Sequence, residues 1–164
     1  MSTIREDMAE FRHQLELGSI QKAYRALISY MTDLRARYKS EWGEQAVSGL
    51  YLGYLDMTYF ALLPPSLIPH GLKVAIVFNY DAFRFEAWLA ARNRQVQRHY
   101  WELLHNYPIG EYRLVAPASG VDAIVETVLA DYFEQDTTDA LTARIQERTA
   151  AFVADMERLL SRLE

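Results

Sequence analysis

Seven side chains between Tyr54 and Trp88 have the chemistry to bind a small polar ligand. They supply two carboxylates, a guanidinium, an amide, a hydroxyl and two aromatic rings, and they are Tyr54, Asp56, Thr58, Asn79, Arg84, Glu86 and Trp88. A guanidinium binds carboxylate or phosphate groups in a planar, bidentate way, and aromatic rings form apolar pocket walls. We therefore expect a polar pocket over a sheet, in which Arg84 anchors an anion and Trp88 and Tyr54 form the walls.

The same residues also fit a purely structural role. A charged side chain on a covered sheet face must be paired, because burying a lone charge is costly. Arg84 could pair with Glu86 or Asp56 and hold the sheet to a helix, or this face could simply be solvated. Residue types alone leave these interpretations open.

Most catalytic and metal-binding motifs are missing from the sequence. The chain contains no cysteine, which excludes disulfides, thiol catalysis and thiolate metal sites. It also lacks a glycine-rich phosphate loop, a G-x-S-x-G elbow and an H-E-x-x-H metal site. Glu102 and His105 form one E-x-x-H pair, whereas di-iron bundles use two. We expect no metal and no cofactor.

One enzymatic alternative involves two of the seven residues. A hydrolase or nuclease could use Asp56 and Glu86 if neighbouring strands brought these carboxylates together. The lysine that such a nuclease site needs two residues after the glutamate is replaced by Trp88. We therefore expect no catalytic residues and keep the enzyme as the alternative.

Composition limits the partners and the location of the chain. Its 164 residues fit one domain, residues 1–164, and its net charge of −5 argues against nucleic acid, which binds clustered Lys and Arg. The opening residues, MSTIREDMAEF, carry charges where a signal peptide has its apolar core. No apolar run approaches the roughly 20 residues of a membrane span. These features predict a cytoplasmic protein without membrane contact.

Helical periodicity predicts two helices ahead of the seven residues. Thr3 and Glu6 form a capping-box pattern, which starts a first helix over residues 4–17. Gly18 ends this helix, and a second apolar stripe covers residues 20–38. We expect the pair to form a helical hairpin that packs against the rest of the chain.

An antiparallel sheet must then position the seven residues. Residues 46–63 contain glycines, tyrosines and a weaker helical pattern, and we interpret them as a strand. Residues 73–79 are apolar on both faces, as in a central strand, and residues 83–89 alternate cleanly after a turn. The predicted sheet has three strands over about residues 46–90, or four with a short strand at 112–116.

Three helices should follow the sheet and pack on it, which makes the fold class α+β. The period becomes helical over residues 90–107. A second helix is predicted over residues 119–132, with Ser119 at its start, and a polar connector over 134–139 leads to the last helix at 139–163.

The last helix carries an apolar stripe with the 4-3-4-3-4 spacing of a coiled coil. Its members are Ile145, Thr149, Phe152, Met156, Leu159 and Leu163. This stripe can dock onto the chain's own domain or form the seam of a homodimer. The second interpretation gives a further functional alternative, a self-associating accessory protein.

Two stretches resemble a family of small bacterial cytoplasmic proteins of unknown function. They are GYLDMTYFALLP at residues 53–64 and LKVAIVFNYDAFRFEAWLAARNRQVQ at residues 72–97, and the similarity extends to the opening helices and to DALT at Asp139. The resemblance implies a bacterial cytosolic setting and carries no activity or catalytic residue. The functional prediction is thus a non-catalytic binding module for a small anionic or aromatic ligand or for a protein partner.

Overall fold

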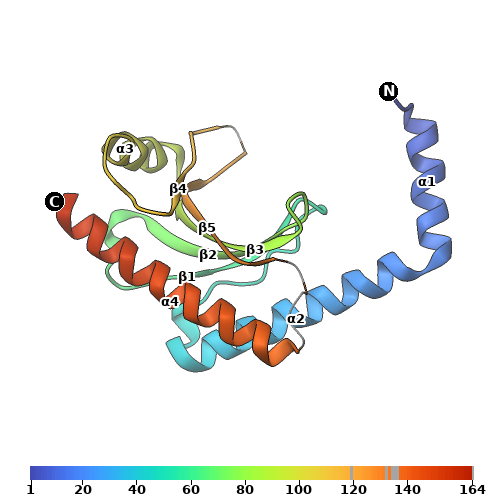
Figure 1. The fold of residues 1–164 in the computed structure, drawn as a ribbon, viewed down its shortest axis with the longest axis horizontal. Helices are drawn as coiled ribbons and strands as arrows, with labels where there is room; N and C mark the ends of the chain where they lie inside the picture. Colours follow the sequence, from blue (N-terminus) through green and yellow to red (C-terminus); the bar gives the residue numbers. More distant parts are fainter. Residues whose placement is uncertain (119, 132, 134–136, 164) are drawn as a thin grey trace.

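The computed structural model (Figure 1) describes residues 1–118, 120–131, 133 and 137–163. Its elements are, in order, α1 (Ile4–Leu17), α2 (Ser19–Trp42), η1 (Glu44–Ala46), β1 (Met57–Leu62), η2 (Ile68–His70), β2 (Leu72–Asn79), β3 (Arg84–Ala91), α3 (Arg94–Leu104), β4 (Arg113–Leu114), β5 (Ala123–Asp131) and α4 (Thr138–Leu163). The fold class is α+β, as the sequence predicts.

The strands form one antiparallel sheet in the order β1-β2-β3-β5-β4. A tight turn joins β2 to β3, whose first residue, Arg84, pairs with Asn79. β5 pairs with β3 over most of its length, whereas β4 pairs with β5 only through Arg113 and Leu114. The sheet therefore has five strands, more than the three or four predicted.

The additional strand is β5, where the sequence analysis predicts a helix over residues 119–132. Its sequence, AIVETVLAD, is rich in β-branched residues that pack well on a pleated surface, and β3 offers it an edge. Among the described residues, two helices therefore follow β3 instead of three. Ser119 and Tyr132, the ends of the predicted helix, lie outside the described residues, as do positions 134–136 of the predicted connector.

The predicted strand over residues 46–63 is shorter in the structure. β1 begins only at Met57, and the chain before it runs back along the outer edge of β1. Isolated bridges join Val47 to Leu62 and Tyr51 to Tyr59. The glycines and tyrosines that suggest one long strand therefore belong to a segment folded against itself.

One face of the sheet packs against α2 and α4, which cross each other on that side of the sheet in Figure 1. The apolar side chains of this face and of the two helices form the core, with Met31, Phe60, Ile76, Phe85 and Phe152 all 0% exposed. A buried hydrogen bond of 2.8 Å between the Tyr30 and Thr142 hydroxyls links α2 to α4. We call the sheet with α3, α4 and the part of α2 from Ala26 onward the body.

The apolar stripe of α4 belongs to this core. Ile145, Thr149, Phe152, Met156 and Leu159 are buried, and Leu163 is partly buried against the same cluster. The stripe thus docks onto the chain's own sheet, and a second copy of the chain cannot reach these side chains in this structure.

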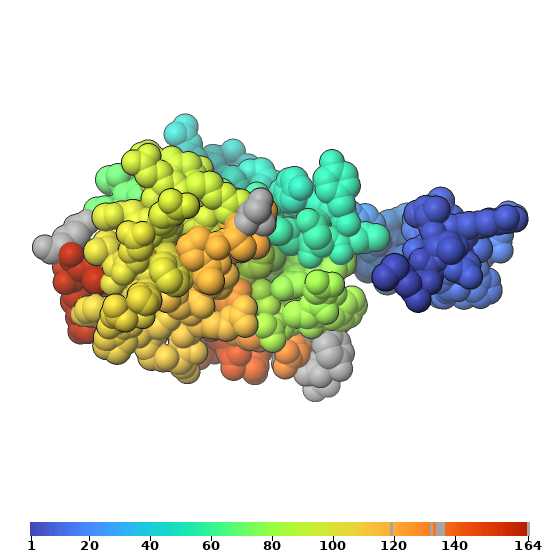
Figure 2. All heavy atoms as spheres, turned by 90° about the horizontal axis from the view of Figure 1, so that it is seen from above, coloured from blue at the N-terminus to red at the C-terminus, as the bar shows by residue number. Residues whose placement is uncertain are grey.

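α1 and α2 are helices with the predicted boundary near Gly18, but α1 does not pack on the body. Figures 1 and 2 show α1 projecting away from it, and no residue of α1, which the structure describes throughout, is buried. Gly18 adopts the left-handed conformation, with φ 81°, and turns the chain between the two helices. The expected packing fails because Ile4, Met8 and Phe11, the large apolar residues on one side of α1, keep half or more of their surface in solvent.

Truncating the α4 stripe should destabilise the monomer. Leu159→Ala removes a buried side chain and should lower the free energy of unfolding by about 2–5 kcal/mol. The matched variant Leu17→Ala, on the exposed α1, should change it by less than about 0.5 kcal/mol. Urea denaturation measures both variants, and equal effects would contradict the assignment of the stripe to the core.

Candidate functional site

Glu86 is a buried carboxylate in the middle of β3. Its side chain is 2% exposed, and it accepts hydrogen bonds from Arg84 Nε at 2.7 Å, Trp88 Nε1 at 2.8 Å and Asn79 Nδ2 at 3.4 Å. These donors engage both carboxylate oxygens, and the bond from the guanidinium is charge-assisted. Three of the seven predicted site residues therefore surround the carboxylate of a fourth, Glu86.

Strand geometry explains this cluster. Side chains at alternate positions of a strand point to the same face, so Arg84, Glu86 and Trp88 line up along β3, and Asn79 pairs with Arg84 across the turn. The register between β3 and β5 shifts on both sides of the segment 86–89. Register shifts of this kind often occur beside functional sites, where they re-aim side chains.

Thr58 is not part of the cluster, contrary to the prediction. Met57, and not Thr58, shares the sheet face of Asn79, because these two residues are direct partners. Thr58 lies on the core face with Phe60 and is 0% exposed. The prediction was wrong by one residue, since burying Phe60 places Thr58 on the same side.

Tyr54 and Asp56 lie in the loop before β1. Tyr54 is 89% exposed and therefore does not form the predicted wall. The Asp56 carboxylate accepts a hydrogen bond from the backbone N–H of Tyr54 at 2.8 Å. That bond, together with one from the Met57 backbone, lowers the pKa of Asp56 below its usual value, so this carboxylate stays ionised at neutral pH.

A hollow of about 180 Å³ opens over the sheet face that carries Trp88, and we call it the sheet hollow. It is lined by Tyr51, Asp56, Met57, Tyr59, Lys73, Ala75, Trp88, Ala90, Gly120 and Asp122. Ala75 on β2, the cross-strand partner of Trp88, leaves space on the β1 side of the indole, and Ala90 leaves space beside Trp88 along β3. The rings of Tyr59 and Tyr51 are 5.1 Å apart, so two aromatic side chains face the hollow from its β1 side.

Sequence reasoning missed Tyr51, Tyr59 and Lys73 as members of this hollow. Tyr59 follows Thr58 in β1 and therefore lies on the opposite sheet face, so the error that placed Thr58 in the site left Tyr59 out of it. The sequence did contain a sign that Lys73 matters. It is the one charged residue of β2, and all other residues of this strand are apolar except Asn79 at its end. Tyr51 joins through its bridge to Tyr59, which no local pattern predicts.

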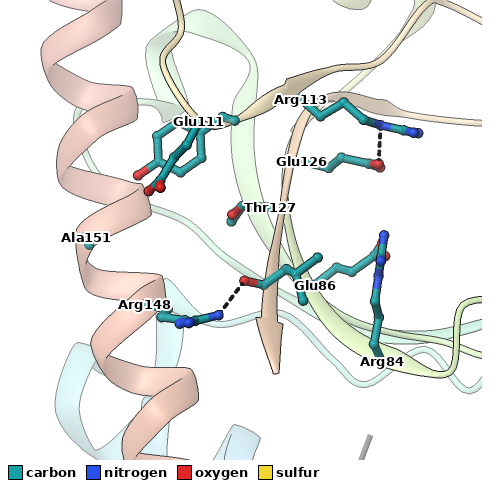
Figure 3. A pocket seen from close by; sticks show the side chains of 10 residues that line it. Arg84, Glu86, Glu111, Arg113, Glu126, Thr127, Arg148 and Ala151 are labelled. Atoms are coloured by element: carbon teal, nitrogen blue, oxygen red, sulfur yellow. Dashed lines mark hydrogen bonds and ion pairs between the residues drawn. The ribbon is translucent and has the colours of Figure 1, made fainter. Parts of the chain in front are cut away.

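A second hollow, of about 380 Å³, lies where β4 ends, and we call it the edge hollow (Figure 3). It is lined by Arg84, Glu86, Glu111, Tyr112, Arg113, Glu126, Thr127, Val128, Arg148 and Ala151. Because β4 stops after two residues, the next part of β5 has no strand beside it on that side. Arg148 from α4 donates there to the carbonyl oxygens of Val128 and Leu129, each at 3.3 Å.

Glu126 is the second carboxylate close to Glu86. Arg113 Nε donates to Glu126 Oε1 at 2.7 Å, and the Glu126 side chain is only 14% exposed. Burial raises the pKa of Glu126, the nearby charge of Glu86 raises it further, and Arg113 and Arg84 oppose this rise. Glu126 therefore binds a proton more readily than an exposed carboxyl.

The structure does not assemble the enzymatic alternative. Asp56 lines the sheet hollow and Glu86 lines the edge hollow, and both oxygens of Glu86 already accept hydrogen bonds. Within the described ranges, no three His, Asp or Glu side chains gather closely enough to hold a metal ion. Likewise, none of the helices built from described residues has the length and apolarity to cross a membrane.

Comparison with known proteins places the chain in an uncharacterised family. The family described as Domain of unknown function (DUF7000) matches residues 4–160, and the chain belongs to this family. No curated protein matches the chain, and no solved structure does. Membership of a family of unknown function is therefore confirmed, and it transfers no activity to the site.

Removing Arg84 should destabilise the body more than removing a comparable exposed arginine. Arg84→Ala leaves the buried Glu86 carboxylate without its charged partner, which should lower the free energy of unfolding by about 1–3 kcal/mol. Arg113→Ala breaks an ion pair whose arginine is 73% exposed, and should change it by less than about 1 kcal/mol. Chemical denaturation at neutral pH measures the free energy of unfolding of both variants. A larger decrease for Arg113→Ala would contradict the conclusion that the buried Glu86 carboxylate depends on Arg84.

The raised pKa of Glu126 predicts a pH-dependent stability difference. For a group whose pKa is raised by folding, the associated stability is complete below the unfolded-state pKa and is lost as pH rises through the folded-state pKa. The free energy of unfolding of the wild type, relative to Glu126→Gln, should therefore decrease from acidic to neutral pH. Urea titrations of both proteins at several pH values measure this difference. The contributions of carboxyl groups that both proteins share cancel when the two free energies are subtracted. A difference that grows with pH would show the opposite pKa shift.

Proposed function

We propose that this member of the DUF7000 family is a non-catalytic binding module whose sheet hollow takes a small ligand with a planar ring and an anionic group. The fixed position of Trp88 carries this proposal. Its indole Nε1 donates to Glu86 at 2.8 Å, and Arg84 holds Glu86 in turn at 2.7 Å. A side chain fixed before binding loses little conformational freedom when the ligand arrives, which favours affinity.

The shape of the sheet hollow suits a flat ligand. Trp88 on β3 lines one side of the hollow and Tyr59 and Tyr51 line the other, and the side chain of Ala75, next to Trp88 on β2, is small. Aromatic rings pack against planar groups in offset or edge-to-face arrangements. A ring that enters this space can contact aromatic side chains on both sides.

The charges around the sheet hollow suggest the polar groups of the ligand. Lys73 supplies an ammonium group, a compact charge that attracts carboxylates and phosphates. Asp56 and Asp122 supply acceptors for hydroxyl or amine donors of the ligand. In this proposal Lys73 takes the role of anion anchor that the sequence assigned to Arg84, because Arg84 Nε is engaged with Glu86.

The dimensions of the hollow favour a small molecule over a protein partner. A volume of about 180 Å³ holds a single ring with its substituents, whereas protein partners bury broad surfaces. The bacterial cytosolic setting implied by the sequence resemblance belongs to the same proposal, as the place where such a metabolite would be met.

A thermal-shift screen tests the proposal with aromatic carboxylates and mononucleotides as probes. A ligand present at 100 times its dissociation constant should stabilise the protein by about 2.7 kcal/mol. Ala75→Leu, which fills the hollow, and Lys73→Ala, which removes its ammonium group, should each reduce the shift strongly. Arg113→Ala, which removes a cation from the edge hollow, is the matched control and should leave it unchanged. A probe whose stabilisation survives Ala75→Leu binds elsewhere and contradicts the proposal.

A further inference from the structure

The N-terminal helix and the start of α2 form an arm outside the body. We define the arm as residues 4–25, that is α1 and α2 up to Arg25. The buried residues of α2 begin only at Leu27, so the preceding turns do not contribute to the core. Figures 1 and 2 show this arm, in blue, extending from the body and ending in a free-standing α1.

α1 presents an apolar stripe without a covering surface. Ile4, Met8, Phe11 and Leu15 follow the 4-3-4 spacing of helices that pack against another helix. Ile4 is 76% exposed, Met8 56% and Phe11 50%. A helix of 14 residues is close to the length at which isolated helices are only marginally stable in water. The stripe therefore lacks the packing that normally stabilises such a helix.

A second apolar surface lies at the nearby end of the sheet, in the loops before β1 and between β2 and β3. We call it the sheet end and define it by Leu52, Leu55 and Phe83, which are 46%, 56% and 53% exposed. Leu55 and Phe83 both have positive φ angles, 63° and 53°, which are uncommon for large apolar residues and mark strained positions. Two strained loops thus hold apolar side chains toward solvent.

The sheet end lies beside the base of the arm. The ring of Tyr80, in the β2–β3 turn, packs 6.5 Å from that of Tyr24 on α2. The backbone N–H of Tyr80 also donates to the Asp56 carbonyl at 3.1 Å, which joins the two loops. Both views show these loops on the side of the body from which the arm projects.

The charges of α1 and of the base of the arm are complementary. α1 carries Glu6, Asp7, Glu10 and Glu16 against two arginines, a net charge of −2. The base of the arm, residues 19–25, carries the exposed Lys22 and Arg25 and no acidic residue. The same chain therefore carries an acidic helix with an apolar stripe, and a positively charged segment that adjoins the apolar loops of the sheet end.

We propose that the arm forms a domain-swapped homodimer with a second copy of this chain. In this dimer, α1 of each copy packs its apolar stripe on the base of the arm and on the sheet end of the other copy. A two-fold arrangement brings both copies of this contact together at once, because such an interface is self-complementary. The net negative charge of α1 disfavours the alternative of a membrane surface, which attracts basic amphipathic helices.

The exposed surface is large enough for this pairing. Each large apolar side chain of the stripe leaves half or more of its surface in solvent, apart from the partly buried Leu15. Two reciprocal contacts between stripes and sheet ends approach the roughly 1,000 Å² expected of a specific interface. The α4 stripe, which is buried in the core, is not needed for this dimer.

Light scattering coupled to size-exclusion chromatography tests, with the full chain, whether two copies form the proposed dimer. The wild type should elute as a dimer, with twice the 19.0 kDa chain mass, at high micromolar concentration. Met8→Asp with Phe11→Asp places charges in the stripe and should give the monomer. Because α1 contributes no buried residue, the body should remain folded, which circular dichroism and thermal melting verify.

Two further variants sharpen the test. Ala9→Asp with His13→Asp adds charge on the opposite side of α1 and should leave the dimer intact. Leu55→Asp with Phe83→Asp alters the sheet end and should also give the monomer, since Asp tolerates positive φ angles better than bulky residues. A wild type that stays monomeric at high concentration overturns the proposal. So does a dimer that survives either stripe or sheet-end variant.

Discussion

The buried carboxylate of Glu86 constrains the sheet face that lies opposite α2 and α4. A charge with 2% of its side chain exposed is stable in a sheet only if donors surround it, and Arg84, Trp88 and Asn79 are fixed in supplying them. The indole thereby becomes a rigid boundary of the sheet hollow, and the guanidinium a boundary of the edge hollow. One charge on β3 thus fixes one wall of each hollow.

The two faces of the sheet differ in how their side chains pack. The face that packs on α2 and α4 is filled by large apolar side chains, as in other closely packed cores. On the opposite face, Ala75 and Ala90 alternate with charged and aromatic residues, so space remains beside well-ordered polar groups. This division explains why a stable core and two hollows coexist within a few strands.

Local pattern was enough to predict some parts of this structure. The alternation in β3 placed Arg84, Glu86 and Trp88 on one face, and the apolar run of β2 identified the central strand. The pattern failed where long-range pairing decides: β5 becomes a strand because β3 accepts it as a partner, and Thr58 follows the burial of Phe60. It also could not reveal that Ile4, Met8 and Phe11 of the α1 stripe stay half or more exposed in their own chain. The edge hollow was missed because β4, β5 and α4 meet there only after folding.

Arg148 has a consequence for the solubility of the folded chain. An unpaired strand edge is a template on which another chain can add a strand and start an aggregate, and native proteins block such edges with charged side chains. β5 exposes such an edge where β4 ends, and the guanidinium of Arg148 occupies two of its carbonyl oxygens. Among the described residues, the guanidinium of Arg148 thus stands where a longer β4 would pair with β5, and a cation in that position disfavours the addition of a strand from another molecule.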